Sequence, residues 1–173
     1  MFNRKLLSAL VATGLVVTGS YTANVLAATD DGVADAVILI PLSIAHDTGA
    51  SLDFGTITPD GDGATVRVTT AGVASVTGGD AILSGTTSAD SFTVSGQGGQ
   101  NYNITLPGSI TLTGPGDDMT VNNVVSNPAT SSTLPAGLGT QTETLTIGGD
   151  LVIGADQGAG SYSGTYTVEV VWP

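Results

Sequence analysis

Residues 161–173 read SYSGTYTVEVVWP, and in this stretch apolar and polar side chains alternate almost without interruption. A period of two predicts a β-strand with one buried face and one face in water. We call residues 162–172 the closing segment. A long amphipathic strand has unpaired backbone groups at its edges, so this segment needs neighbouring strands to cover it. Its predicted buried face consists of Tyr162, Tyr166, Val168, Val170 and Trp172.

Short runs with the same alternation recur along the chain and predict an all-β fold. Ser51–Thr58 and Ala64–Thr70 are expected to be two strands of a hairpin. The turn between them is expected at Pro59–Gly63, because its glycines tolerate positive φ. No stretch outside the N-terminal leader shows helical periodicity over two turns. Short strands at this spacing are typical of a β-sandwich.

The second half of the chain continues the pattern. Thr142–Ile147 and Leu151–Ile153 are expected to be separate strands joined by a tight turn at Gly148–Asp150. Ser126–Gly139 is rich in Asn, Pro, Ser and Thr, and this composition predicts an exposed loop.

The N-terminus has the organisation of a secretory signal peptide, residues 1–27. Arg4 and Lys5 form a basic start, and an apolar run extends from Leu6 to Val17. Val25-Leu26-Ala27 offers small residues at the two positions that a signal peptidase reads, so cleavage is expected after Ala27, with Ala28 as the second choice. An uncleaved membrane anchor is the alternative, but Gly14, Gly19 and Ser20 interrupt the apolar run.

Composition limits the partners of the exported chain. Cleavage leaves Arg67 as the one basic residue against fifteen acids, so nucleic-acid binding is excluded for want of clustered Arg and Lys. We expect Arg67 to pair with an acid on a sheet face. Cysteine is absent, so an exported domain of this kind must be stabilised by packing and sheet hydrogen bonds.

Residues 28–41 form an N-terminal extension ahead of one domain at 42–173. Within the extension, Val33–Ile40 reads VADAVILI, and Val37–Ile40 would present apolar side chains on both faces of a strand. Such a strand is expected to be buried on both sides. Pro41 cannot donate to a strand ladder and marks a break. The apolar strand either folds back on its own domain or serves another molecule.

Two motifs carry a resemblance to a known family: LDFGTITP at Leu52–Pro59 and GSYSGTYTVEVVW at Gly160–Trp172. Together with the apolar N-terminal strand, they make the chain resemble the major subunits of chaperone–usher fimbriae. More narrowly, it resembles a domain family of unknown function related to the Mat/Ecp-type fimbrillins. Many such pilins carry a disulfide, and the lack of cysteine here fits only the branches without one.

The resemblance implies an immunoglobulin-like β-sandwich that is incomplete and is completed by a donated N-terminal strand. The closing segment would flank the acceptor groove with Tyr162, Tyr166, Val168, Val170 and Trp172. The donated strand would comprise Val33, Ala34, Ala36, Val37, Ile38, Leu39 and Ile40.

The resemblance also implies a structural subunit of a secreted surface fimbria (pilus) that polymerises head to tail by donor-strand exchange. The implied partners are further copies of the chain, a periplasmic chaperone, an outer-membrane usher, and a host or surface receptor. The chain would pass through the periplasm to the cell surface of a Gram-negative bacterium. Two alternatives stay open: a monomer whose strand complements itself, and a self-contained adhesin or surface-layer binding module that uses loops such as Ser126–Gly139.

Few residues offer catalytic or metal chemistry. His46, the only histidine, is expected in a polar turn as a solvated residue, and no serine lies in a GxSxG elbow. Asp60 and Asp62 resemble the start of a calcium loop, but the glutamate that such a loop needs at position twelve would fall on Ala71. We therefore expect no enzyme activity, no cofactor and no metal site.

Overall fold

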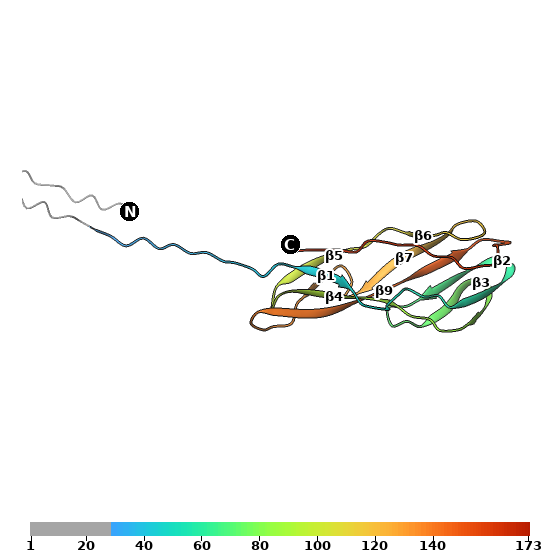
Figure 1. Cartoon of the computed structure of the whole chain (residues 1–173), viewed down its shortest axis with the longest axis horizontal. Helices are drawn as coiled ribbons and strands as arrows, with labels where there is room; N and C mark the ends of the chain where they lie inside the picture. Colours follow the sequence, from blue (N-terminus) through green and yellow to red (C-terminus); the bar gives the residue numbers. More distant parts are fainter. Residues whose placement is uncertain (1–28) are drawn as a thin grey trace, which may run out of the picture. The chain divides into compact units, whose positions relative to one another are not determined.

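A computed structural model describes residues 29–173, and the expected signal peptide lies outside them. Val37–Pro173 form one unit; residues 29–36, considered by themselves, are exposed and form no strand. The unit Val37–Pro173 is all-β and consists of antiparallel sheets, which confirms the expected β-sandwich class (Figure 1). Within residues 29–173, no helix has the length and apolar character needed to cross a membrane.

Ten strands lie in the described part of the chain. In chain order they are β1 (Ser43–His46), β2 (Thr56–Val68), β3 (Ala74–Ser84), β4 (Asp90–Gln97), β5 (Asn101–Thr105), β6 (Ile110–Leu112), β7 (Met119–Asn127), β8 (Ser131–Thr133), β9 (Thr140–Ile153) and β10 (Glu169–Val171).

The long strand β9 organises the larger sheet. Residues 140–147 of β9 pair with β4, residues 149–153 pair with β2, and residues 146–152 pair with β7. Since β7 overlaps both of the other partners, β4 and β2 follow one another along one edge of β9 and β7 occupies the other. The sheet is extended by β1 on β4, by β3 on β2 and by β6 on β7. A second sheet has the order β10-β5-β8.

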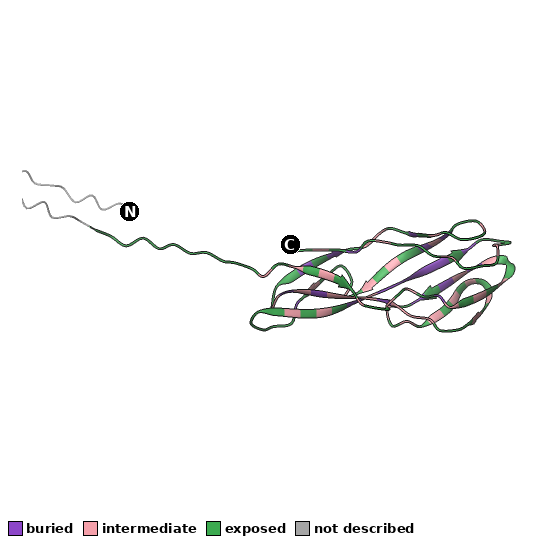
Figure 2. Cartoon of the chain, viewed as in Figure 1, coloured by how far each residue is buried: buried purple, intermediate pink, exposed green. Residues whose placement is uncertain are grey.

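The apolar core has two parts, and the inward residues alternate with exposed ones along the strands (Figure 2). The half-buried Val124 and Tyr166 pack against both parts and join them. The first core consists of Phe54, Ala64, Val66, Val68, Ile110, Met119, Val121, Leu151 and Ile153. The second core, where the two sheets face one another, consists of Val94, Tyr102, Ile104, Leu134, Leu145, Ile147 and Val168.

The expected turn at Gly148–Asp150 is wrong, because these residues lie inside β9. The two glycines are there for close approach between strands. A Cβ on Gly148 would lie 2.5 Å from the carbonyl oxygen of Val68, and one on Gly149 would lie 2.6 Å from Cγ1 of Val121. Glycine inside a strand often marks such a site, and sequence alone does not distinguish it from a turn.

The expected hairpin turn at Pro59–Gly63 is wrong in a similar way. The strand β2 continues through it and pairs with β3 on both sides of it, from Pro59 opposite Ala81 to Ala64 opposite Gly79. The residues between bulge out of the ladder, and Gly61 and Gly63 have the expected positive φ of 105° and 89°. The two glycines adopt the positive φ expected of a turn, but here they form a bulge within one strand.

The expected exposed loop at Ser126–Gly139 is also corrected. Its first two residues end β7, and Ser131–Thr133 form β8, which pairs with β5. Leu134 directly after β8 is 1% exposed and belongs to the second core. Only part of this stretch is therefore available as a surface loop.

Candidate functional site

The side chains of the closing segment face inward and outward as the alternation predicts. Val168 is buried, and the other four members of the predicted inner face are partly buried, namely Tyr162, Tyr166, Val170 and Trp172. Ser163, Thr165, Thr167 and Glu169 are exposed. The period of two therefore identified the face that packs on the core.

The closing segment is paired with its neighbours only near its two ends. The expected single long strand is therefore wrong, and the strand that forms, β10, covers Glu169–Val171 only. Glu169–Val171 pair with β5, and Ser163 forms an isolated bridge with Thr113. Between these pairings, the segment that faces the closing segment contains Pro107, which has no N–H to donate. The two segments are not paired there, and together they line a hollow of about 570 Å³.

Two strands at one side of the sandwich have a neighbour on one edge only. β1 pairs with β4 and β10 pairs with β5, and no ladder joins β1 to β10 in the described residues. The two strands nevertheless lie close together. Their free edges therefore lie on the same side of the sandwich, which we call the open side. An unpaired strand edge is a template for pairing with another strand.

Apolar side chains of the second core reach the open side and are only partly covered there. Leu42 and Ile44 come from β1 and the residue before it, and Val170 and Trp172 come from the closing segment. Leu42 and Trp172 converge over Gly96 of β4, where an added Cβ would lie 2.9 Å from the Trp172 ring and 3.1 Å from Leu42. The open side thus combines free backbone edges with half-buried apolar surface.

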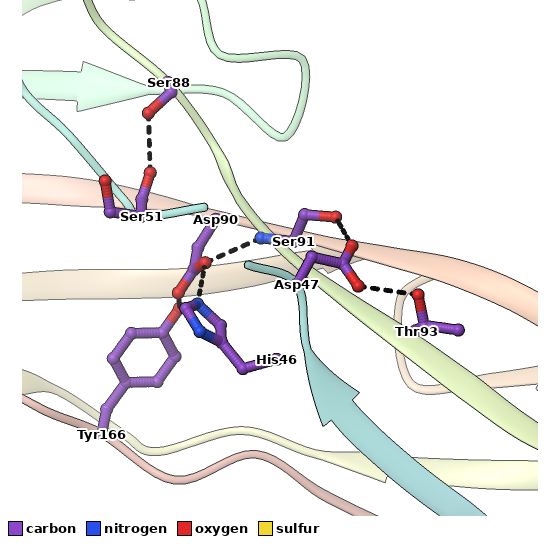
Figure 3. Close-up of polar contacts among 8 residues, drawn as sticks. All are labelled: His46, Asp47, Ser51, Ser88, Asp90, Ser91, Thr93 and Tyr166. Atoms are coloured by element: carbon purple, nitrogen blue, oxygen red, sulfur yellow. Dashed lines mark hydrogen bonds and ion pairs between the residues drawn. The ribbon is translucent and has the colours of Figure 1, made fainter. Parts of the chain in front are cut away.

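A buried carboxylate lies beneath the open side. Asp90 is 4% exposed and accepts hydrogen bonds from the Tyr166 hydroxyl at 2.5 Å and from its neighbour's backbone N–H, that of Ser91, at 2.8 Å. His46 at the end of β1 bonds the same carboxylate through Nε2 at 2.7 Å. Figure 3 shows the histidine and the tyrosine converging on Asp90. The carboxylate therefore connects β1, β4 and the closing segment.

Aromatic packing accompanies these hydrogen bonds. The ring of Phe92 lies 4.9 Å from that of His46 and 6.3 Å from that of Tyr166, centroid to centroid. Burial of the Tyr166 hydroxyl, followed by its bond to Asp90, raises the pKa of Tyr166 far above its ordinary value. His46 was expected to be a solvated turn residue; its side chain is 49% exposed, but it lies at the end of β1 and one ring nitrogen is bonded to a buried acid.

A second carboxylate joins β1 to β4 nearby. Asp47 accepts hydrogen bonds from the Ser91 hydroxyl and, at 2.7 Å, from the Thr93 hydroxyl (Figure 3). The hydrogen bond from Ser91, followed by that from Thr93, lowers the pKa of Asp47. A nucleophilic triad needs the serine hydroxyl on the histidine. Here Ser91 donates to Asp47, while His46 is bonded to Asp90, so the hydrogen bonds hold strands together.

The expected ion pair of Arg67 is confirmed, on the larger sheet. Its Nε and Nη2 each lie 2.6 Å from a carboxylate oxygen of Asp150, and Asn123 donates to the same carboxylate at 2.8 Å. The hydrogen bond from Arg67 is the main cause that lowers the pKa of Asp150. Asn123 has a positive φ of 47° where β7 departs from its ladder with β9, so this cluster fixes an irregularity of the sheet.

The apolar part of the extension is exposed. Val37 is 88% exposed, Ile38 91% and Leu39 42%, and no strand is formed before Ser43 in the described residues. Val33, considered by itself, is 89% exposed. Large apolar side chains in a row are seldom left in water, and their exposure marks an interaction site.

These observations define a β-sandwich domain with two free strand edges on one side and an exposed apolar extension. Residues 42–172 match the family described as a domain of unknown function (DUF4402), and the chain belongs to this family. Neither the curated proteins nor the solved structures that were compared gave a match to the chain. Val33–Ile40 lie outside the residues that the family match covers.

Sequence reasoning missed two residues of the open side. Asp90 is a single acid in front of the alternating run SFTVS, and nothing in the sequence indicates that its partners lie far away in the chain. Gly96 opens a glycine-rich run that has the composition of a turn, yet it lies within β4. The available signal was that SFTVSGQ continues the alternation through this glycine.

Proposed function

We propose that the protein is a structural subunit of a surface fimbria, in which the extension Val33–Ile40 of one copy pairs along the open side of the next. The single observation that carries this proposal is the combination, in one chain, of an exposed apolar extension and a sandwich with two adjacent free edges. A strand that pairs with the free edge of β1 or of β10 would complete the backbone pairing of that strand. This is strand addition, in which backbone bonds give affinity and alternate side chains give specificity.

The energy available from the extension supports the proposal. Burying Val37, Ile38, Leu39 and Ile40 would contribute roughly 1.5–3 kcal/mol each, or about 6–12 kcal/mol together, before the cost of ordering the segment. The same contact repeated from copy to copy is heterologous and does not close on itself, so it generates a fibre. Pro41 lies between the extension and β1, and it opposes the continuation of β1 into the extension as one uninterrupted strand.

The proposal includes the route by which such a subunit reaches the surface. The signal peptide at residues 1–27 would direct the chain to the periplasm of a Gram-negative bacterium. A periplasmic chaperone would cover the open side until an outer-membrane usher exchanges it for the extension of another copy. The exposed apolar surface supports the need for such cover, because an unpaired edge with apolar side chains aggregates.

The proposal is tested by removing the extension and adding it back as a peptide. The mature chain lacking Val33–Ile40 should stay monomeric, and a synthetic peptide of residues 30–41 should bind it and raise its melting temperature. A matched control peptide with Ile38→Asp and Ile40→Asp should bind far more weakly, because it places charge on apolar surface. The proposal would be contradicted if the truncated chain is folded but neither binds the peptide nor gains melting temperature from it. Full-length chains that never polymerise would contradict it too.

A further inference from the structure

We propose that Asp90 is a positioning residue that sets the spacing of the open side, with His46 and Tyr166 as the two side chains that it holds. The proposal rests on the function proposed above and adds how the receiving surface is kept ready. No backbone ladder joins β1 to β10 in residues 29–173, so side chains make the contacts that link the two strands directly. Asp90 supplies such a contact because both sides bond to one carboxylate.

The geometry makes this contact specific. His46 Nε2 lies 2.7 Å from Oδ1 of Asp90, and the Tyr166 hydroxyl lies 2.5 Å from Oδ2. Each carboxylate oxygen therefore holds one of the two elements. A carboxylate taken out of water needs such partners, and hydrogen bonds to a charged acceptor are stronger and shorter than neutral ones.

The strand β4 provides a fixed base for the arrangement. Asp90 begins β4, which is paired with β9 along its whole length, and Phe92 on the same strand packs against both His46 and Tyr166. β1 and the closing segment are held less firmly, since each has one paired edge at most. The buried carboxylate thus ties β1 and the closing segment to a strand that is paired on both of its edges.

If β1 and the closing segment are already fixed in position, fewer groups must be ordered when another strand binds to them. Binding is weakened by every group that must first be immobilised, so a fixed spacing raises affinity without a new contact to the incoming strand. Loss of either bond to Asp90 should therefore weaken strand uptake and loosen the opposite edge as well.

The closing segment offers a matched pair of variants for the test. Tyr166→Phe removes only the hydroxyl bonded to Asp90. Tyr162→Phe is the matched control: the resemblance would place Tyr162 beside the acceptor groove, but its ring packs against the first core alone. Its hydroxyl bonds to Gly116, Gln157 and Gly158 and not to Asp90. His46→Phe probes the other side, because it keeps a ring against Phe92 and removes the bond to Asp90. All three are made in the full mature chain.

The first measurement is hydrogen exchange followed by mass spectrometry. Tyr166→Phe should speed exchange in β1, which Tyr166 does not pair with, and His46→Phe should speed exchange in the closing segment. Tyr162→Phe should leave β1 unchanged. If Tyr166→Phe affects only the closing segment, or if both tyrosine variants affect β1 equally, Asp90 does not couple the two edges and the inference is overturned.

The second measurement is the rate of polymer formation by light scattering. Tyr166→Phe and His46→Phe should each slow it about ten-fold relative to the wild type, whereas Tyr162→Phe should leave it unchanged. Equal rates for all chains would overturn the positioning role. A wild type that forms no polymer would instead overturn the proposed function, and the exchange measurement would still decide whether Asp90 couples β1 to the closing segment.

Discussion

Tyr162 and Tyr166 occupy equivalent places in one alternating pattern, yet their hydroxyls bond to partners in different parts of the sandwich. The Tyr162 hydroxyl donates to the carbonyl of Gly158 and accepts hydrogen bonds from Gly116 and Gln157. It belongs to the end where the strands are joined by several ladders. Tyr166 donates to Asp90, 76 residues away, at the side where two strand edges are free. Periodicity predicts which way a side chain faces, but the partner of its polar tip depends on the tertiary fold.

The largest expected effect comes from the two halves of β9, one of which supports the open side and the other the first core. Leu145 belongs to the second core and Leu151 to the first, and both are almost fully buried. Truncation to Ala should lower the free energy of unfolding by about 2–5 kcal/mol in either case, measured by urea denaturation. Only Leu145→Ala should also slow polymerisation, because only Leu145 supports the open side. An equal effect of both variants on polymerisation would remove the distinction between the two halves.

Two strand glycines should differ in their response to an added methyl group. On Gly148 the Cβ would meet a backbone oxygen of Val68 at 2.5 Å, which cannot move without disturbing the sheet. On Gly96 it would meet the ends of Trp172, Leu134 and Leu42 at 2.9–3.1 Å, and side chains can shift. We expect Gly148→Ala to cost about 3 kcal/mol and Gly96→Ala about 1 kcal/mol in thermal or denaturant unfolding. The reverse order would show that the open side is packed more rigidly than β9.

The ion pair on the larger sheet should contribute to stability in a pH-dependent way. Arg67 lowers the pKa of Asp150 in the folded chain, so the folded state binds its proton less readily than the unfolded state. The stabilisation is therefore complete above the unfolded value of 3.8 and is lost as the pH falls through the lower folded value. Asp150→Asn should destabilise the chain by about 1–3 kcal/mol at pH 7.

The difference between the wild type and Asp150→Asn should shrink as the pH is lowered from 5 to 2, followed by urea denaturation at each pH. A difference that is constant over this range would mean that the carboxylate charge contributes nothing. Asp47→Asn should show a change of the same sign, because hydrogen bonds from Ser91 and Thr93 lower the pKa of Asp47. Its effect should be the smaller one, since Asp47 pairs with neutral hydroxyls.

The sequence predicted the fold class and the inner face of the closing segment because both follow from local alternation. It did not predict that β2 and β9 are long strands, since Pro59–Gly63 and Gly148–Asp150 have the composition of turns. Whether glycine ends a strand or lets a neighbour approach depends on what lies opposite, such as Val68 and Val121. The pairing of Arg67 was predicted in kind, whereas its partner Asp150 was assigned to a turn.

The candidate site was predictable to a similar extent. The apolar run at Val33–Ile40 is visible in the sequence because it lacks the alternation of a half-buried strand. The role of Asp90 was not visible, because its two side-chain partners come from residues 44 and 76 positions away. The resemblance to fimbrial subunits suggested where a strand would be received, and the free edges of β1 and β10 give that suggestion a physical basis.

Cross-linking in the full mature chain tests the central claim most directly. The chain has no cysteine, so Asp35→Cys in the extension and Val171→Cys in β10 can be joined selectively with a short bifunctional maleimide. If the extension of one copy lies along the open side of the next, the double variant should give a ladder of covalent oligomers on a denaturing gel, and either single variant should give at most a dimer. A cross-linked monomer alone would show that the extension returns to its own domain and would contradict the account.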